Sequence, residues 1–281
     1  MSFRHLLPFA LLAVAACSDG DEIPEDPSAA APAPAGVAAA EATNAAVAET
    51  GGAMSVDEET ELYSFEYAYP AEAGAISALA RQLNADLAER RQELITSARE
   101  GMEQAEDSGF PYNAYSFSKE WKVVADLPGW LSLSGDFSTY TGGAHGMYGL
   151  ESLVWDKDVG RGFPAIELFT SAEALDTALG DRLCEALNRE REEKRGEPVP
   201  SDGESDFEKC IGVEEATILA GSSNGRTFDR IAVWFGPYVA GPYAEGSFEL
   251  DFPVDQAILD AVRTAPLSPE NVLAQHRPAG G

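Results

Sequence analysis

The sequence predicts an α+β fold with a mainly antiparallel sheet, two long helices and one short C-terminal helix, in one domain or two closely packed lobes. Segments with strand character follow one another in groups, whereas the segments with helical periodicity stand apart from them. A doubly wound parallel sheet would instead alternate strand and helix along the chain. We place an N-terminal lobe at residues 60–160 and a C-terminal lobe at residues 161–264.

The N-terminal lobe begins with a strand and a long helix. Residues 62–69 are rich in aromatic side chains and partly alternate, and Pro70 ends this strand. Between Ile76 and Met102, apolar residues recur at spacings of three, four and seven, which places them on one face of an amphipathic helix. Three further strands are expected at 117–125, 130–140 and 147–155. The first turn between them is Leu127-Pro128-Gly129, and the second is the glycine-rich turn 141–146.

The C-terminal lobe begins with the second long helix, at residues 172–194, where leucines recur every four positions. Thr170 and Glu173 stand at the spacing of a capping box at its start. The remaining elements are three short strands and a short helix, in the order 214–219, 228–235, 247–252 and 255–263.

The N-terminus has the organisation of a secretory signal peptide over residues 1–16, with Arg4 before an apolar run. Val14-Ala15-Ala16-Cys17 resembles the lipobox of bacterial lipoproteins, so we expect cleavage before Cys17 and lipid on that cysteine. The alternative is an ordinary secretory peptide followed by a buried or paired cysteine. Lipidation would place the protein on the periplasmic face of the cell envelope, with the lipid as its only contact with the membrane. Since Ser18 follows the cysteine where aspartate often marks inner-membrane retention, the outer membrane is favoured.

Two segments are predicted to be tethers rather than folded parts. Residues 17–59 are rich in alanine, proline and acidic residues, and apolar burial there could not offset the entropy of ordering. Residues 265–281 contain three prolines and are expected to form a flexible tail.

The charge of the chain excludes some classes of partner. With 19 basic and 48 acidic residues, the formal net charge is −29, which repels nucleic acid and anionic membrane surfaces. A cationic partner or a divalent cation would be attracted. Solubility alone is the other explanation of this acidity.

The cysteines indicate one disulfide. If Cys17 carries lipid, Cys184 and Cys210 remain as the pair available in an oxidising compartment. We expect them to be bridged rather than free, since their spacing fits neither a redox CxxC motif nor a set of zinc ligands.

Motifs for catalysis and cofactors are scarce in the sequence. It contains neither a P-loop lysine motif nor a GxGxxG fingerprint. Gly221 to Gly225 matches the G-x-S-x-G pattern of a hydrolase nucleophile elbow, but a strand is predicted after it where the elbow needs a helix. A hairpin turn is therefore the better interpretation. Of three histidines, His5 would leave with the signal peptide and His276 lies in the tail, so we expect no metal site, no cofactor and no catalytic residues.

His145 is the remaining histidine, and it lies in the glycine-rich turn beside Tyr140 and Thr141. Its side chain could form hydrogen bonds to a ligand, or it could only lock the turn through nearby backbone groups. Gly142 and Gly143 fit both interpretations, because glycine allows positive φ and close approach of another backbone.

Four motifs together resemble the paired domains of unknown function 4163 and 3298, over about residues 62–263. The first is Tyr140-Thr141-Gly142-Gly143-Ala144-His145-Gly146, followed by Trp155 to Gly160 and by Glu167-Leu168-Phe169. The last is Tyr238 to Gly246, ending in Leu250-Asp251-Phe252-Pro253. The resemblance implies an α+β fold and relates the chain to extracytoplasmic segments of lysozyme-sensing anti-sigma factors and to non-catalytic parts of peptidoglycan deacetylases. This chain departs from both groups, because it has neither a sigma-binding segment with a transmembrane helix nor a deacetylase domain with metal ligands.

Three hypotheses about function follow. The first is a non-enzymatic binding or sensing module for an envelope protein, such as a lysozyme-like one, or for peptidoglycan. Its candidate ligand-binding residues are the aromatic, histidine and glycine residues of two turns: Tyr140, Thr141, Gly142, Gly143, His145, Tyr238 and Tyr243. The second is a wall-polymer hydrolase or deacetylase that uses His145 beside an acid such as Asp136. The third is a purely structural lipoprotein in which nothing binds.

Overall fold

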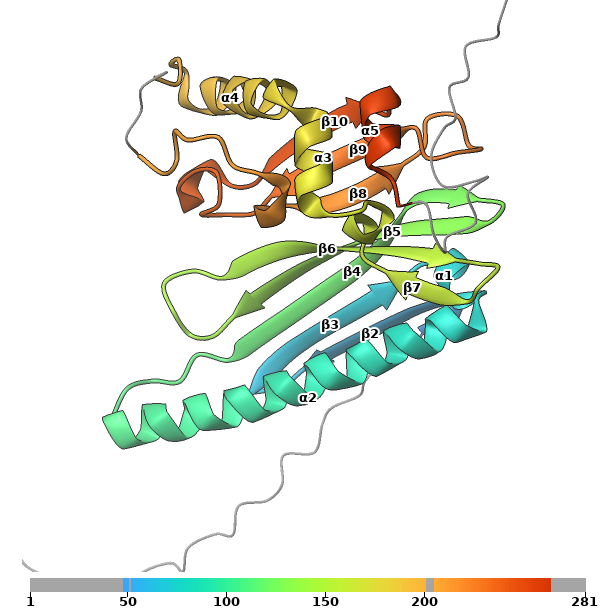
Figure 1. The fold of residues 1–281 in the computed structure, drawn as a ribbon. Helices are drawn as coiled ribbons and strands as arrows, with labels where there is room; N and C mark the ends of the chain where they lie inside the picture. Colours follow the sequence, from blue (N-terminus) through green and yellow to red (C-terminus); the bar gives the residue numbers. More distant parts are fainter. Residues whose placement is uncertain (1–47, 51, 201–204, 264–281) are drawn as a thin grey trace, which may run out of the picture. The chain divides into compact units, whose positions relative to one another are not determined.

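The computed structural model describes residues 48–50, 52–200 and 205–263. The predicted signal peptide, Cys17, most of the predicted tether and the predicted C-terminal tail lie outside these residues, and their predictions remain predictions. The α+β class is confirmed, with a seven-stranded sheet, a three-stranded sheet and helices beside them (Figure 1). No helix in the described part of the chain is long and apolar enough to cross a membrane.

The larger sheet has its strands in sequence order. All neighbours run antiparallel except β3 and β4, which are parallel because a long helix connects them. The strands are β1 (Ala48–Thr50), β2 (Ala53–Glu59), β3 (Tyr63–Tyr69), β4 (Tyr115–Leu127), β5 (Trp130–Tyr140), β6 (Met147–Asp156) and β7 (Arg161–Phe163). The four strands predicted for this lobe are thus confirmed.

β2 corrects the predicted tether, which was wrong to extend to residue 59. Met54 and Val56 are buried and alternate with exposed residues, as in a strand with one face covered. The third inward position holds Glu58, which is buried and accepts hydrogen bonds from Arg91 and Tyr63. The carboxylate at this inward position hides the alternation in the sequence, because residues 57–59 then form an acidic run with no apolar member.

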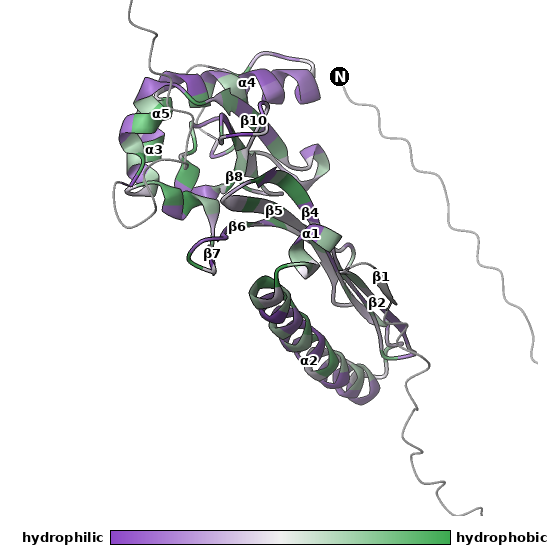
Figure 2. Ribbon diagram, turned by 90° about the vertical axis from the view of Figure 1, so that its right-hand side faces the viewer, coloured by the Kyte–Doolittle hydropathy of each residue, from purple (hydrophilic) through white to green (hydrophobic). Residues whose placement is uncertain are grey.

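The long helix α2 (Ser77–Ser108) lies along one face of this sheet, after the short helix α1 (Ala71–Gly74) (Figures 1 and 2). The prediction of a helix over 76–102 is confirmed, and the helix continues to Gly109, whose φ of 70° ends it in the left-handed conformation. Leu79, Leu83 and Ala98 bury the apolar stripe against aromatic residues of the strands. The apolar periodicity ends earlier than the helix, which explains why the predicted end was too early.

The C-terminal half contains the three-stranded antiparallel sheet, in the order β10, β9, β8, with three α-helices. Its elements are η1 (Ala165–Leu168), α3 (Ala172–Leu179), α4 (Asp181–Arg195), η2 (Val213–Glu215), β8 (Thr217–Gly221), β9 (Arg230–Phe235), η3 (Tyr243–Glu245), β10 (Phe248–Pro253) and α5 (Gln256–Ala261). The three strands and the short last helix were predicted, although the segment 213–215 at the start of the first strand is a 3-10 turn.

The prediction of one continuous helix over 172–194 is wrong. Gly180 stands between α3 and α4 with φ 54° and ψ −141°, a conformation that glycine adopts readily and other residues rarely do. The predicted capping box is wrong as well. Ser171 caps α3 by accepting a hydrogen bond from the Ala174 amide at 3.0 Å, while the Thr170 hydroxyl donates to the Ala261 carbonyl at 2.7 Å.

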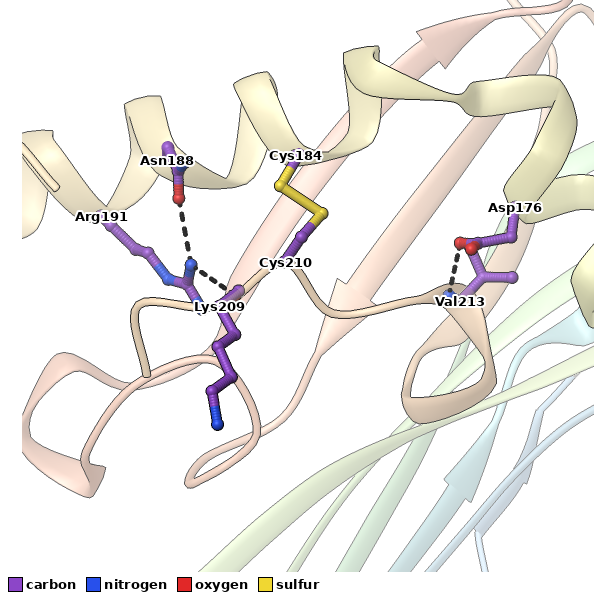
Figure 3. Close-up of a disulfide and its surroundings, with 7 residues drawn as sticks. All are labelled: Asp176, Cys184, Asn188, Arg191, Lys209, Cys210 and Val213. Carbon is purple, nitrogen blue, oxygen red and sulfur yellow. Dashed lines mark hydrogen bonds between the residues drawn. A yellow bond between two sulfur atoms is a disulfide. The ribbon is translucent and has the colours of Figure 1, made fainter. Parts of the chain in front are cut away.

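The disulfide between Cys184 and Cys210 is confirmed and ties α4 to the segment before η2 (Figure 3). Beside it, the fully buried Arg191 donates from Nη1 to Asn188 Oδ1 and to the Lys209 carbonyl, both at 3.0 Å. Its Nε donates to the Ala240 carbonyl at 2.9 Å. Burial, with Arg195 nearby, lowers the pKa of Arg191 to about 10. This part of the chain is therefore held by one covalent link and one guanidinium that bonds to backbone carbonyls and an asparagine.

Strands β4 to β6 contribute side chains to two cores, one on each face of the sheet. Leu131, Leu133 and Leu153 point into the core under α2, while Trp130 and Val154 point into the core of the C-terminal half. Residues 130–135 of β5 are consequently all buried, whereas residues 136–140 are partly or fully exposed. The C-terminal half thus covers only one end of the second sheet face and leaves the other end open.

Candidate functional site

Two turns that are far apart in the sequence meet at the edge of this open face. The turn 141–146 joins β5 to β6, and the segment 236–247 joins β9 to β10. Side chains from these turns and from the start of β6 form a group that we call the turn cluster, in which His145 and Tyr238 are exposed and Tyr148 and Tyr243 are half-buried. The His145 and Tyr243 rings stack with centroids 4.1 Å apart, and the Tyr243 centroid lies 5.5 Å from Tyr238 and 6.2 Å from Tyr148. Tyr243 is therefore the centre of the group.

Hydrogen bonds to one carbonyl orient the cluster. The Gly146 carbonyl accepts from the Tyr243 hydroxyl at 2.8 Å and lies 2.9 Å from His145 Nδ1. Because a carbonyl only accepts, Nδ1 carries the proton, and in the neutral ring Nε2 is free to accept. The Tyr238 hydroxyl lies 3.4 Å from that Nε2. Gly146 has to be glycine, since a Cβ there would lie 2.7 Å from the Thr139 carbonyl oxygen.

Tyr238 stands in a strained backbone conformation. Its φ of 67° is the only positive φ of a non-glycine residue in the described ranges, and its side chain is 49% exposed. An exposed aromatic residue in the left-handed region costs backbone energy without gaining core packing. Such strain is concentrated at functional sites, where the conformation presents a side chain to a ligand.

The predicted ligand-binding residues come together only in part. His145, Tyr238 and Tyr243 share the turn cluster, although Tyr238 and Tyr243 follow His145 by more than ninety positions. Tyr140 is paired with Ser116 across β4 and β5, and no ring contact joins it to the cluster within the described residues. Thr141 lines a separate small pocket between α2 and the sheet. Gly142, with φ 81°, and Gly143 shape the turn.

A groove of about 570 Å³ crosses the open sheet face and ends at the turn cluster. Tyr148 belongs to both, since it lines the groove and touches Tyr243. Trp234 of β9 and Ser247 line the same groove. The other side chains on this face are mostly acids and serines: Ser55, Asp57, Glu66, Ala68, Ser118, Glu120, Asp136 and Ser138. We call this feature the sheet groove.

Sequence reasoning missed Tyr148, Trp234 and the sheet groove. The alternation within β2 to β5 shows that these acids and serines share one face of their strands. The sequence does not show that this face is uncovered, because in most sheets the position of a covering lobe depends on long-range packing.

The structure gives His145 no acidic partner. Its ring contacts are the Gly146 carbonyl and two tyrosines, and no carboxylate bonds to it in the part of the chain that is described. Asp136 instead forms an ion pair with Lys122 at 3.2 Å. Among the described residues, no three or more His, Cys, Asp or Glu side chains are grouped to hold a metal ion.

The G-x-S-x-G segment is a connection between two antiparallel strands. It joins β8 to β9, and no helix follows its serine. The Ser223 hydroxyl donates to Asp229 Oδ2 at 2.6 Å, and Asn224 Oδ1 accepts from the amides of Arg226 and Thr227. Its side chains thus bond within the turn, as predicted for a hairpin.

Comparisons with known proteins find one family model and two solved structures that are similar to parts of this chain. Residues 56–148 match the family model described as "Deacetylase PdaC", a range that includes the Tyr140 to Gly146 motif. Two similar solved structures belong to the DUF3298 family, whose name the Tyr238 to Pro253 motif suggested. The Bacteroides fragilis protein is 18% identical, covers 72% of this chain and 88% of its own, and has a TM-score of 0.49. The Pseudomonas aeruginosa protein is 15% identical, covers 76% of this chain and 94% of its own, and has a TM-score of 0.41. No curated protein matches the chain.

Proposed function

We propose that this chain is a non-enzymatic binding module of the cell envelope, anchored by lipid on Cys17, which binds its ligand at the turn cluster. The observation that carries the proposal is the meeting of two distant turns around Tyr243, with Tyr238 exposed in a strained conformation. Exposed tyrosines that are rigidly held are well suited to recognition, because they bury a large area at a small cost in side-chain entropy.

Two classes of ligand fit this surface. The net charge of −29 and the acidic groove next to the cluster favour a cationic envelope protein, such as a lysozyme-like protein. Peptidoglycan is the other class, since aromatic rings stack on sugar rings and the hydroxyl groups of the groove can bond to them.

Binding to envelope extract and to purified peptidoglycan tests the proposal. The purified full chain would be immobilised and compared with its Tyr238→Ala and Tyr243→Ala variants. We expect both variants to retain less than about one tenth of the bound material, because hot-spot aromatic residues contribute roughly 2 kcal/mol or more. Phe110→Ala is the matched control, since Phe110 is 74% exposed, follows the C-terminal end of α2 in the chain and makes no ring contact with the turn cluster among the described residues.

Two results would contradict the proposal. One is that neither extract nor peptidoglycan yields a ligand, which would favour the purely structural lipoprotein. The other is a ligand that the Tyr238 and Tyr243 variants bind as well as the parent chain does. A Tyr140→Ala variant separates the predicted surface from the observed one, since Tyr140 lies outside the cluster and should have little effect.

A wall-polymer hydrolase or deacetylase that uses His145 is the second candidate. The match of residues 56–148 to the deacetylase PdaC model favours it. The purified chain and its His145→Ala variant would be incubated with peptidoglycan, and released acetate and soluble fragments measured. No product, or equal product from both proteins, would remove this candidate.

A further inference from the structure

We infer that the sheet groove binds a polysaccharide whose sugars carry free, protonated amino groups. The inference rests on the proposed function in taking the chain to be a binding module, and it names the ligand class for the surface that adjoins the turn cluster.

The register of the sheet arranges the groove side chains in two rows across the strands. In the first row, Asp57 lies opposite Glu66, which is followed by Ser118, Ser138 and Tyr148. In the second row, Ser55 lies opposite Ala68, followed by Glu120 and Asp136. Neighbouring strands are about 4.8 Å apart, so the first row runs about 19 Å across five strands and ends at the aromatic cluster.

Each row contains two acids directly opposite one another, which is unfavourable because like charges repel across a strand pair. In the second row Lys122 relieves the repulsion, with its Nζ 3.1 Å from Glu120 and 3.2 Å from Asp136. Asp57 and Glu66 are exposed, and neither forms an ion pair with any described residue. A cation bound over the first row would relieve the repulsion between Asp57 and Glu66, as Lys122 does for Glu120 and Asp136 in the second row.

Backbone pairing leaves no place for an added peptide strand in the middle of the groove. Over the groove residues, β3, β4 and β5 each have a strand on both sides, so their backbone groups are used within the sheet. A ligand over these three strands must therefore be recognised through side chains. Ser118 and Ser138 hydroxyls, 2.8 Å apart, retain donor or acceptor capacity for the many hydroxyls of a polysaccharide.

The geometry of the groove fits a chain of sugars. One pyranose residue is about as long as the spacing between two strands, so a polysaccharide along the first row would place about one sugar over each strand. At the far end Tyr148 and Trp234 offer ring faces on which a sugar can stack. Amino groups on the sugars provide the positive charge that Asp57 and Glu66 require, and acetylated sugars lack it.

Titration of the full-length protein with two hexasaccharides tests this inference. The probes are the β-1,4-linked hexamers of glucosamine and of N-acetylglucosamine, in mildly acidic buffer where the free amines are protonated, with heat of binding as the readout. We expect the glucosamine hexamer to bind at least about tenfold more tightly. The double variant Asp57→Asn with Glu66→Gln should lose about tenfold of this affinity, since it removes both charges and keeps the shapes.

The matched control removes two charges elsewhere. Glu103→Gln with Glu106→Gln changes exposed residues near the end of α2 and removes the same amount of negative charge, so it should change the affinity by less than about twofold. An equal loss in this control would overturn the inference, because general attraction by the acidic chain would then explain the binding.

Three other results would overturn it: no binding of the glucosamine hexamer, equal binding of the two hexamers, or hexalysine that binds as tightly as the glucosamine hexamer and depends equally on Asp57 and Glu66. These results are separable from those for the turn cluster. If the tyrosine variants abolish envelope binding while the Asp57 and Glu66 variant leaves glucosamine binding intact, the inference alone fails. If the reverse holds, the assignment of function to the turn cluster fails.

Discussion

The two faces of the seven-stranded sheet both carry a lysine that pairs with two carboxylates, but one lysine is buried under α2 and the other is exposed in the groove. On the face under α2, the Lys119 side chain is fully buried and its Nζ lies 2.8 Å from both Asp86 Oδ2 and Glu151 Oε2. On the groove face, Lys122 of the same strand is 53% exposed and also pairs with two carboxylates. Burial makes pairing obligatory, because an isolated ion loses its hydration, whereas an exposed ion keeps it.

The buried network extends beyond the ion pairs. The Tyr67 hydroxyl donates to Asp86 Oδ2 at 2.8 Å and accepts from Trp121 Nε1 at 2.9 Å, and the Lys119 Nζ lies 4.6 Å from the Trp121 ring. The polar atoms of this network therefore satisfy one another, whereas the buried Trp155 Nε1 in the same core has no hydrogen-bond partner among the described residues. Asp57 and Glu66 in the groove form no ion pair with any described residue and are available to a ligand.

Replacing the two lysines of β4 gives the largest expected difference between the faces. Lys119→Met should destabilise the fold by about 3 kcal/mol, because Asp86 and Glu151 lose their buried cation and keep only the partly exposed Arg90 as an ion-pair partner among the described residues. Lys122→Met should cost less than about 1 kcal/mol, as exposed ion pairs do. Urea unfolding of both variants measures the difference, and equal costs would contradict the comparison.

Removing a tyrosine hydroxyl should likewise cost more stability under α2 than in the turn cluster. Tyr67→Phe should cost about 1 to 2 kcal/mol by removing the hydroxyl that bonds to Asp86 and Trp121, while Tyr238→Phe should cost less than about 0.5 kcal/mol. Unfolding by urea at neutral pH provides the measurement.

Alkaline pH adds a second test of Tyr67. Burial, and then the charge of Asp86, raises the pKa of Tyr67 above its ordinary value near 10. The unfolded chain therefore loses this proton first, so the contribution of Tyr67 is complete below about pH 10 and is lost as the pH rises further. The stability of Tyr67→Phe should fall less steeply than that of the parent chain above this pH, and identical slopes would contradict the prediction.

Removing the opposed acids of the groove should stabilise the chain slightly. Asp57→Asn with Glu66→Gln relieves a like-charge pair, so we expect a gain of about 0.5 kcal/mol at low salt that disappears at high salt. A loss of stability in thermal unfolding would show that these acids have structural partners.

Asp229 should give the smallest effect, since it lies in an exposed turn away from either face. Partial burial alone would raise the pKa of Asp229, but hydrogen bonds from the hydroxyl and amide of Ser223 and from Asn224 outweigh it and hold the pKa below its ordinary value. The contribution is present above the unfolded pKa and is lost as the pH falls through the folded one. Asp229→Asn should therefore reduce the acid sensitivity of amide exchange in the β8–β9 turn, and unchanged sensitivity would contradict this.

Local chemistry in the sequence determined most elements of this protein. Periodicity predicted the strands β3 to β6 and the helix α2, because each repeats a pattern that is set by its own backbone geometry. The pairing of Cys184 with Cys210 was also predicted, since few cysteines were available. Where the local pattern was interrupted, prediction failed: Glu58 hid β2, and Gly180 divided a helix that the leucines alone would continue.

Only the tertiary structure decided which side chains face one another. Register placed Asp57 opposite Glu66, and packing of the C-terminal half on one end of the sheet brought Tyr238 and Tyr243 to His145. These contacts join residues that are distant in the sequence, so they depend on how complete elements pack. A local pattern carries no information about that packing, and this is why the sequence named three members of the turn cluster but not Tyr148 or the sheet groove.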